Sequence, residues 1–453
     1  MYKPYKVPVT RVFPDIKVPQ PRISKVVLLL VRLLVRLYLF LLFGVVKVLH
    51  QGDSLYEAFR RALAGESRCI IAFRHPNGGE PQILGWFFLF KLKALAAKKG
   101  IRFARKPHAL FVYGYEVVRW GGRPARLVMP NVGAMPIHHS KMDSQGMARI
   151  YKAITEGTYP VALAPEGQVS YTTDSIPRLE PGAVRIGFHA AQQLADKNIN
   201  CPVEILPVSI HFQFGWVGKL SMERLLRKIE KYCGFSGKAE GKHPIEERLR
   251  KCRDYILKMN EDRYCIKSDD SLSFNERLER VVNAAVENAE RMLGIKNEGD
   301  FFARLYKIRQ VCWDRIFLPS LDNINNMSRV ERGIKDIAAG EAWHIARHQE
   351  LADFGWYFRH PVPTEDSPLH SKVEYVQNLW DFANRTMGGA ISGRKNILIR
   401  KVIIQSGPVV NLSRRLPEYK ENKKAAINES LSELEKAYLY CINEANKSLV
   451  KLD

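Results

Sequence analysis

Short apolar runs divide the first half of the chain into predicted strands and turns. Cys69–Phe73 and Val161–Ala164 are continuous apolar runs of the length expected for buried strands, and residues typical of a turn follow each of them. Catalytic side chains are often displayed in loops at the ends of such strands. The pattern therefore directs attention to the residues just after these two runs.

Beyond residue 217 the period of the pattern changes. From Lys219 to about Gly393 it predicts charged amphipathic helices, such as Asn275–Met292 and Val330–Phe354, joined by Gly, Pro and Asp-rich breaks. Lys401–Asn411 then predicts a strand, a Gly-Pro turn and a second strand-like run. Tyr419–Asn446 predicts a final helix.

The N-terminal region predicts a helix that associates with a membrane. Residues 26–46 are almost wholly apolar, but only Leu37–Val46 runs without a charge, whereas a span needs ~20 apolar residues. At about 100° per residue, four basic side chains fall on one narrow stripe of the helix: Lys25, Arg32, Arg36 and Lys47. An arginine near the bilayer centre costs about 2.5 to 3.5 kcal/mol, so an interfacial, monotopic helix is favoured over a spanning one.

A second apolar segment, Ile83–Leu95, is rich in aromatic residues. Its side chains fit the lining of an apolar tunnel or a contact with the bilayer. A buried core helix explains the same composition equally well, because aromatic runs are common in cores. Both interpretations stay open at this stage.

The charge balance favours an anionic partner. The chain holds 70 Lys plus Arg against 47 Asp plus Glu, for a formal charge of +23. Residues 1–50, which include the apolar helix, hold nine Lys or Arg and one acid, Asp15. Near an anionic bilayer each basic residue contributes about 1 kcal/mol to the free energy of membrane binding. Because no recognised nucleic-acid motif is present, we expect membrane lipids and no nucleic acid as partners.

The cysteines and the helical histidines add little chemistry. Seven cysteines show no Cys-x-x-Cys spacing, which argues against a zinc ribbon or a disulfide framework and favours a reducing, cytoplasmic setting. His344 and His348 lie one helical turn apart, as metal ligands can, but Ile345 stands where a zinc-protease helix carries Glu. We expect surface histidines here, and neither a metal nor a cofactor.

His75 and Glu80 are the candidate catalytic pair. They follow the run Cys69–Phe73, with Gly78 and Gly79 between them to adjust the loop. An imidazole with a pKa near 6.5 suits a general base, and a carboxylate on its other ring nitrogen would fix the tautomer and stabilise the imidazolium. The alternative is a Gly-rich surface turn with a hydrogen-bonded histidine.

Four blocks in order resemble the glycerolipid acyltransferase superfamily, best known from the 1-acylglycerol-3-phosphate acyltransferases. The first is His75 with Glu80, where the family usually has Asp. The others are Gly133–His139, Ala164–Ser170 with its Pro-Glu-Gly core, and Ile205–Val208. The resemblance covers roughly residues 60–215. It implies an α/β fold with a mixed sheet flanked by helices.

By this resemblance the second and third blocks line the acceptor side of the site. The implied substrate-binding residues are Gly133, His139, Pro165, Glu166, Gly167 and Gln168. Glu166 has a bland alternative as a solvated residue in a strand-terminating turn. His139 and Val169 stand where the family has arginines, and valine cannot make bidentate contacts to phosphate. Other cations that could take over anion binding, or could simply be solvated, are Lys141, Arg178 and Arg185.

The resemblance and the pattern together give the expected organisation. Residues 1–50 form a basic arm and membrane-associated helix, 51–217 the acyltransferase core, 218–396 a helical insertion, and 397–453 a strand and helix that complete the core. The expected activity is O-acyl transfer from an acyl-CoA or acyl carrier protein thioester to a lysophospholipid, with 1-acylglycerol-3-phosphate as the leading acceptor, in phospholipid biosynthesis. The alternatives are another lipid acceptor, or a membrane scaffold with impaired catalysis.

Overall fold

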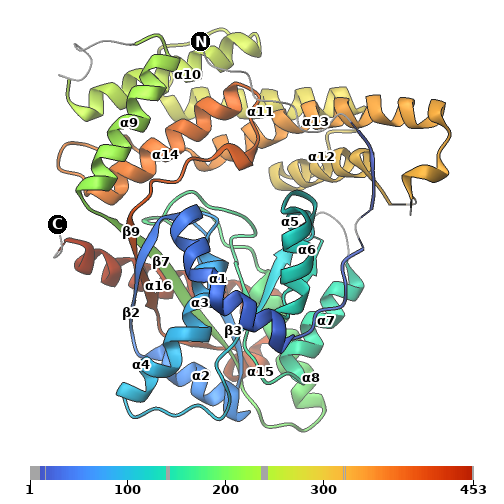
Figure 1. Ribbon diagram of the computed structural model, residues 1–453, viewed down its shortest axis with the longest axis vertical. Coiled ribbons are helices and arrows are strands. Elements are labelled where there is room, and N and C mark those ends of the chain that lie inside the picture. Colours follow the sequence, from blue (N-terminus) through green and yellow to red (C-terminus); the bar gives the residue numbers. More distant parts are fainter. Residues whose placement is uncertain are drawn as a thin grey trace. The chain divides into compact units, whose positions relative to one another are not determined.

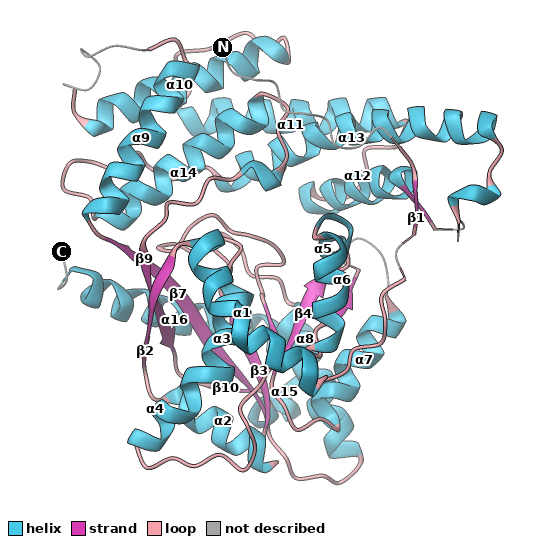
Figure 2. Cartoon of the chain, in the orientation of Figure 1, coloured by secondary structure: helices cyan, strands magenta, loops and turns pink. Residues whose placement is uncertain are grey.

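The computed structural model describes residues 11–15, 17–138, 143–235, 243–319, 321 and 323–450. The chain forms two compact units. Unit 1 comprises Met1–Lys17 and Trp216–Ile397, and unit 2 comprises Val18–Gly215 and Leu398–Asp453. Helices make up most of unit 1, and the large sheet belongs to unit 2 (Figures 1 and 2).

Unit 2 is built on a mixed sheet whose strands, within the described residues, follow the order β2-β9-β7-β3-β6-β4-β5, with β10 paired to β7. From β7 to β5 neighbouring strands are parallel, whereas β9 runs antiparallel to β7 and parallel to β2. The strands are β2 (Val45–Gln51), β3 (Arg68–Phe73), β4 (Leu110–Gly114), β5 (Met135–Ile137), β6 (Val161–Leu163), β7 (Val203–Phe214), β9 (Arg400–Ser406) and β10 (Val410–Asn411).

Helices cover both faces of this sheet. Because side chains alternate between faces along a strand, Ile70 and Ala72 of β3 join one core with side chains of several helices. These helices are α7 (Ser144–Thr155), α8 (Gly182–Asp196), α15 (Leu416–Glu421) and α16 (Lys423–Val450). Phe73 points to the opposite face, where Phe111 contacts both Phe73 and Phe88. On this side lie α2 (Ser54–Ala64), α3 (Glu80–Phe87), the π-helix Phe88–Leu92 and α4 (Lys93–Lys98).

Most of unit 1 is inserted in the chain between two neighbouring strands of unit 2. Phe214 ends β7, Arg400 begins β9, and the two are register partners in the antiparallel pair. Residues Trp216–Ile397 of unit 1 lie between them in the chain. The C-terminal segment then returns to unit 2, where β9 occupies a position inside the sheet and α16 packs on β7 and β9.

Unit 1 consists mainly of amphipathic helices. They are α9 (Trp216–Tyr232), α10 (Ile245–Arg263), α11 (Phe274–Leu293), α12 (Phe301–Ile316), α13 (Arg329–Tyr357) and α14 (Leu369–Thr386). A capping box of Ser273 and Glu276 begins α11, and Gly294 in the left-handed region ends it. The helices predicted over Asn275–Met292 and Val330–Phe354 are therefore confirmed. Unexpectedly, strand β1 (Phe13–Pro14) of the N-terminal arm pairs with β8 (Phe317–Leu318).

Three details of the sequence prediction are wrong. The apolar helix, α1 (Lys25–Phe43), ends at Gly44 in the left-handed region, so the last residues of the predicted stretch belong to β2. Lys47 is in this strand and not on the basic stripe of the helix. The fourth block is expected to close its strand with Pro207 and Val208, whereas β7 continues to Phe214. The final helix is interrupted at Asn422, between α15 and α16.

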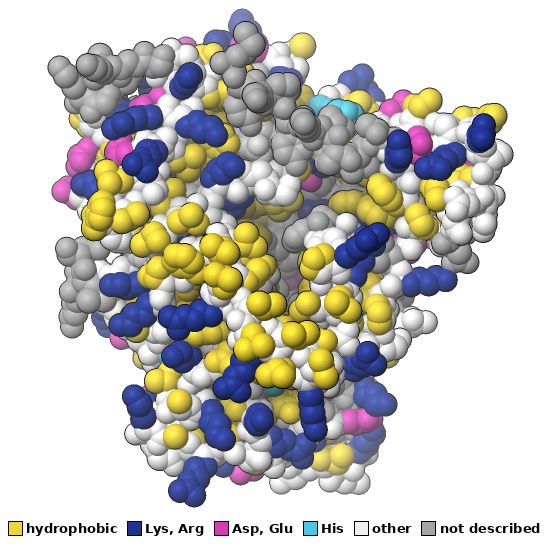
Figure 3. Space-filling view, viewed as in Figure 1, with side chains coloured by type: hydrophobic (Ala, Val, Ile, Leu, Met, Phe, Trp, Pro, Cys, Tyr) yellow, Lys and Arg dark blue, Asp and Glu magenta, His cyan; other side chains and the backbone are white. Residues whose placement is uncertain are grey.

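Helix α1 exposes an apolar surface. Among the residues of α1, Leu39 alone is buried by the described part of the chain. By length and composition the helix could cross a membrane. Its exposed apolar side chains form a patch with Lys and Arg side chains around it (Figure 3). The patch includes Val26, Leu29, Leu30, Leu33, Leu34, Leu37, Phe40, Leu41 and Leu42. The side of α1 that faces the protein contacts α3 and α6 (Gly122–Asn131).

Candidate functional site

His75 and Glu80 form a hydrogen-bonded pair. His75 lies two residues after β3, and Glu80 is the first residue of α3. The Nδ1 of His75 lies 2.7 Å from Oε2 of Glu80, so the expected hydrogen bond is present. The His75 side chain is 18% exposed while that of Glu80 is fully buried. The candidate base can thus be reached from outside while its carboxylate partner is shielded from water.

Glu80 is held in the charged form. Its oxygens accept from the backbone N–H groups of Asn77 (2.9 Å) and Gly78 (2.7 Å). Burial opposes ionisation, but the hydrogen bond and charge of His75 and the backbone donors outweigh it, so the pKa of Glu80 lies below its ordinary value. A carboxylate can only accept. The Nδ1 of a neutral His75 therefore carries the proton, and Nε2 keeps its lone pair.

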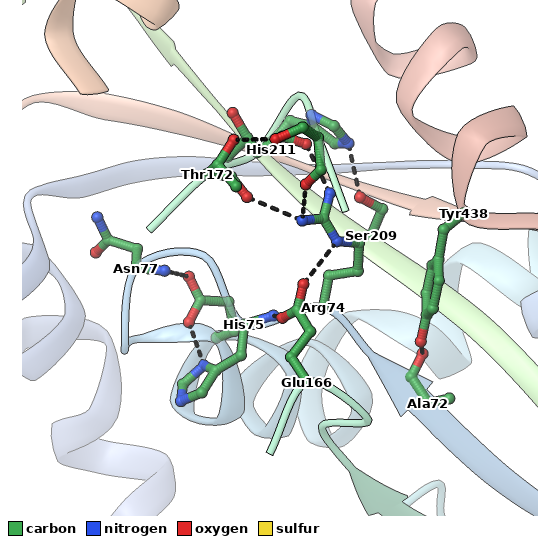
Figure 4. A network of polar contacts seen from close by, with 12 residues as sticks. Ala72, Arg74, His75, Asn77, Glu166, Thr172, Ser209, His211 and Tyr438 are labelled. Carbon is green, nitrogen blue, oxygen red and sulfur yellow. Dashed lines mark hydrogen bonds and ion pairs between the residues drawn. The ribbon is translucent and has the colours of Figure 1, made fainter. Parts of the chain in front are cut away.

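A buried ion pair supports the backbone of His75. Arg74 and Glu166 are 0% and 1% exposed, and Nε of Arg74 donates to Oε1 of Glu166 at 3.0 Å. The other carboxylate oxygen of Glu166 accepts the backbone N–H of His75 at 2.6 Å. Figure 4 shows Glu166 between Arg74 and His75. Glu166 thus positions the candidate base, and the alternative of a solvated glutamate is wrong.

Arg74 also holds the loop that follows the Pro-Glu-Gly sequence. Its guanidinium donates to the carbonyls of Thr172 (2.9 Å), Thr173 (2.8 Å) and Ser175 (2.6 Å). The N–H of Ser170 donates to the carbonyl of His75 at 2.9 Å. These bonds join the first and third sequence blocks into one structure.

The backbone conformation at position 167 favours glycine. Its φ is +74°, and a Cβ there would lie 2.7 Å from Cδ of Glu180. The N–H of Glu180 donates to the carbonyl of the buried Pro165 at 2.7 Å, which closes the loop. Gln168 is partly buried in the same loop.

These residues gather at one edge of the sheet. Since β3, β6, β4 and β5 are parallel, their carboxyl ends share an edge, and His75 and Glu166 follow β3 and β6 at this edge. Ligands of open α/β sheets bind at this edge. Gly133 precedes β5 and lies at the opposite edge, with a φ of +78°. His139 lies outside the described residues.

The positions of the two missing arginines differ in what the structure shows. Val169 lies against the loop between His75 and Glu80, because a Cβ on Gly78 would be 4.0 Å from Cγ2 of Val169. Of the substitute cations, Arg178 pairs with Glu180 at 3.4 Å and Arg185 is exposed on α8. Lys141, like His139, is outside the described residues.

The aromatic segment after the first block is largely core. Ile83, Phe87, Phe88 and Leu92 are all 0% exposed, which favours the buried core helix over a tunnel lining for these side chains. Phe90 is partly exposed, and the guanidinium of Arg32 from α1 lies 5.8 Å from its ring centroid. The basic stripe of α1 therefore meets the protein at this point.

The other candidate groups do not join the site. The Nδ1 of His348 lies 2.7 Å from the hydroxyl of Tyr264, and burial lowers the pKa of His348. Residues 11–138, 143–235 and 243–450, as far as described, hold no group of His, Cys, Asp and Glu that could bind a metal ion. All seven cysteines are unpaired, and Cys265 is the exposed one.

Sequence reasoning missed three supporting residues. Arg74 stood beside His75, and its charge at the end of an apolar strand was a usable signal. Tyr438 of α16 donates to the carbonyl of Ala72 at 2.9 Å, and burial raises the pKa of this hydroxyl so that it stays protonated. Arg400 donates to Oδ1 of Asn77 at 3.2 Å from 323 positions away. No local signal connects residues so far apart.

No protein-family model matches the sequence, and no match is found among curated proteins. The fold and the site therefore define a class only in coarse terms, an α/β protein with a mixed sheet, an apolar N-terminal helix and a buried acid that orients a histidine.

Proposed function

We propose that the protein is a membrane-associated O-acyltransferase. It moves a fatty acyl group from a thioester, either acyl-CoA or acyl carrier protein, to the hydroxyl of a lysophospholipid, a step of phospholipid biosynthesis. The observation that carries the proposal is the 2.7 Å bond between His75 and the buried, ionised Glu80. It leaves Nε2 of a partly exposed imidazole as the base at the carboxyl edge of the sheet.

The proposed chemistry needs one base and one orienting acid. Nε2 of His75 takes the proton of the acceptor hydroxyl as its oxygen attacks the thioester carbonyl. Glu80 stabilises the imidazolium that forms. The tetrahedral intermediate then expels the thiolate, and the imidazolium returns the proton to the leaving sulfur. The acyl group ends as an ester on the acceptor, and His75 is neutral again.

The attachment of α1 supports a helix that lies on the membrane surface. Its N-terminal end is tied to unit 2, because the N–H groups of Arg22 and Ser24 donate to the carbonyls of Pro130 and Asn131. At its other end the carbonyl of Phe43 accepts from Arg400 at 2.7 Å. A helix of this length measures about 28 Å, and both of its ends are fixed to one unit. This arrangement fits a monotopic helix with its apolar patch in the bilayer, and we propose a cytoplasmic catalytic face.

The acceptor is the open part of the proposal. 1-Acylglycerol-3-phosphate is the leading candidate, with Gly167 shaping the wall of its site by resemblance, while the buried Glu166 holds the backbone of His75. Val169 beside the catalytic loop favours a test of acceptors that lack a phosphate monoester, because it offers no charge to that group.

The test is acyl transfer in vesicles with anionic lipid, followed by mass spectrometry. Long-chain acyl-CoA and acyl carrier protein thioesters are offered with 1-acylglycerol-3-phosphate, zwitterionic lysolipids and monoacylglycerol. We expect His75→Ala to lose about 100-fold to 10,000-fold in rate. The control His344→Ala removes an exposed histidine of unit 1 and should keep full activity.

Each outcome separates the candidate functions. Transfer to 1-acylglycerol-3-phosphate that depends on His75 supports the leading acceptor. Transfer only to a phosphate-free or zwitterionic lipid means that Val169 and His139 mark a changed substrate. Full activity in His75→Ala contradicts the mechanism, and no product from any lipid favours the scaffold alternative.

A further inference from the structure

Arg400 occupies an unusual place in unit 2. It is the first residue of β9, where the chain returns from the helical insertion, and its register partners are Val45 of β2 and Phe214 of β7. Its side chain is 0% exposed. A buried guanidinium must be paired or hydrogen-bonded to be tolerated, so its partners reveal what it holds together.

The described partners of Arg400 come from three separate segments. Its Nε donates to the carbonyl of Phe43 at 2.7 Å, and one terminal nitrogen donates to Oδ1 of Asn77 at 3.2 Å. Its guanidinium carbon lies 4.2 Å from the ring centroid of Phe212. Phe43 is the last residue of α1, and a helix C-terminus favours a cation. Arg400 therefore joins the apolar helix to the loop that carries the catalytic pair.

From Asn77 the connection continues to His75. The side chain of Asn77 accepts from Arg400, while its backbone N–H donates to Oε1 of Glu80 at 2.9 Å. Oε2 of Glu80 then accepts from Nδ1 of His75 at 2.7 Å. The hydrogen bonds thus form a continuous path from Arg400 through Asn77 and the carboxylate to the candidate base.

Two features of the backbone fix this arrangement. A Cβ on Gly79 would lie 2.6 Å from the ring of Phe43, so the end of α1 packs tightly on the catalytic loop. Ile399, just before Arg400, has a φ of +63°, a conformation that is an outlier for a β-branched residue. Such strain persists where the surrounding structure imposes it, often at functional sites. Here the N–H of Arg400 also donates to the carbonyl of Gly44 at 2.8 Å.

We propose that Arg400 is a positioning residue that makes the orientation of the His75–Glu80 pair depend on the seating of α1 in unit 2. The proposal rests on the proposed function for its kinetic consequences. When α1 is seated, the carbonyl of Phe43 and the side chain of Asn77 hold Arg400 between them. When α1 is displaced, Arg400 loses the carbonyl of Phe43, and Asn77 and Glu80 lose their fixed partner. The seating of the membrane helix thereby sets the activity.

A purely structural role for Arg400 makes a different prediction. Arg400 would then contribute to folding, and its loss would lower the amount of folded protein without changing the catalytic pair in the molecules that fold. The two roles are separated by signals that come from His75 itself. One is the downfield Nδ1–H resonance of the imidazole that donates to a carboxylate, and the other is the pH profile of kcat.

The test compares Arg400→Gln, Arg400→Lys and Asn77→Ala in full-length protein labelled with 15N-histidine. The protein is bound to anionic vesicles for kinetics and to mixed micelles for spectroscopy, and His75→Ala assigns the resonance. We expect Arg400→Gln and Asn77→Ala to lose the resonance, to lower kcat about tenfold and to shift the pH profile, with KM unchanged. Arg400→Lys keeps the charge but lacks the planar fork, so about threefold is expected.

Non-additivity and a control complete the design. Because both residues act through one path, the double variant Arg400→Gln with Asn77→Ala should lose no more than either single variant. Gly79→Ala places a Cβ 2.6 Å from the ring of Phe43 at the end of α1 and should reproduce the loss. Arg248→Gln removes a buried arginine of unit 1 and should leave the His75 resonance and kcat unchanged. Asn77→Ala keeps the test decisive if Arg400→Gln does not fold.

The readouts distinguish the two proposals. If the wild type transfers no acyl group but Arg400→Gln loses the His75 resonance, the proposed function fails and the positioning role stands. If the wild type is active and folded Arg400→Gln and Asn77→Ala keep both the resonance and kcat, the positioning role is wrong and the function stands.

Discussion

The buried charges beside His75 in unit 2 make different contacts from the ion pairs that join helices in unit 1. In unit 1, Arg304 pairs with Glu290 and Arg277 with Glu261 between neighbouring helices, each through two hydrogen bonds. In unit 2 the buried Arg74 with Glu166 is bonded to the backbone of His75, and Arg400 reaches its loop. The ion pairs of unit 1 connect helices. Arg74, Glu166 and Arg400 of unit 2 instead contact His75 or the loop that follows it.

The largest expected effect tests this difference directly. Arg74→Met leaves Glu166 buried without its cation, and Arg248→Met does the same to Glu230 in unit 1. Removing one partner of a buried pair destabilises by about 3 to 5 kcal/mol, so both variants should lower the free energy of unfolding to this extent. Urea denaturation measures it.

The two variants should differ at His75. Among folded molecules, Arg74→Met should lower kcat, because Glu166 and the loop that contains Thr172 lose their anchor. Arg248→Met should keep the wild-type kcat per folded molecule. Equal kcat in both variants would mean that the buried charges of unit 2 serve stability alone.

A second comparison concerns a partly buried histidine in each unit, His50 and His348. Burial lowers the pKa of His50 in β2 from 6.5 to about 4. At pH values between about 4 and 6.5 the folded state therefore binds fewer protons than the unfolded state. Stability is therefore lost as pH falls from 6.5 to about 4, by at most about 3 kcal/mol, with no further loss from this group below pH 4. The His50→Phe variant keeps contacts to Tyr56 and Phe87 and should flatten that slope.

The matched substitution in unit 1 is His348→Phe. Burial also lowers the pKa of His348, so its effect has the same sign. Thermal unfolding measured at several values between pH 7 and pH 4 compares the two variants. An unchanged slope in His50→Phe would show that His50 is not buried as a neutral group.

The third effect concerns the acid of the pair. In Glu80→Gln the amide can donate to Nδ1, which favours the tautomer with its proton on Nε2 and removes the base. We expect kcat to fall about 100-fold, or about 2.7 kcal/mol in barrier height. Steady-state kinetics across the pH range measure this. Glu290→Gln in unit 1 is the control, and a kcat loss of equal size there would remove the distinction between the units.

The local sequence pattern predicted those features that depend on neighbouring residues. The strand before His75 and the pair His75 and Glu80, five positions apart, were found because each depends on neighbouring residues. The end of α1 was missed although Gly44 carried a signal, since glycine commonly ends a helix in the left-handed region. The apolar residues after it belong to β2, whose place beside β9 is set by pairing with residues about 350 positions away.

The residues that support His75 could not be predicted, because they too come from segments far apart in the sequence. Glu166 meets Arg74 because β6 lies beside β3, and Arg400 meets Asn77 because β9 enters the sheet next to β7. Neither contact has a periodic or compositional signal. The resemblance assigned Glu166 to the acceptor wall, whereas its carboxylate is occupied by Arg74 and the backbone of His75. Its catalytic contribution stays a prediction.

The smallest expected effect concerns backbone strain in the two units. Ile399 in unit 2 and Cys265 in unit 1 both have positive φ, +63° and +55°. A β-branched residue is strained more in this region, so Ile399→Gly should stabilise by about 1 kcal/mol after the entropy loss of glycine, and Cys265→Gly by less. If Arg400 is held in place by that strain, Ile399→Gly should also lower kcat slightly while raising the unfolding midpoint. Cys265→Gly should leave kcat unchanged, and a gain in both stability and kcat from Ile399→Gly would show that the strain does not serve the site.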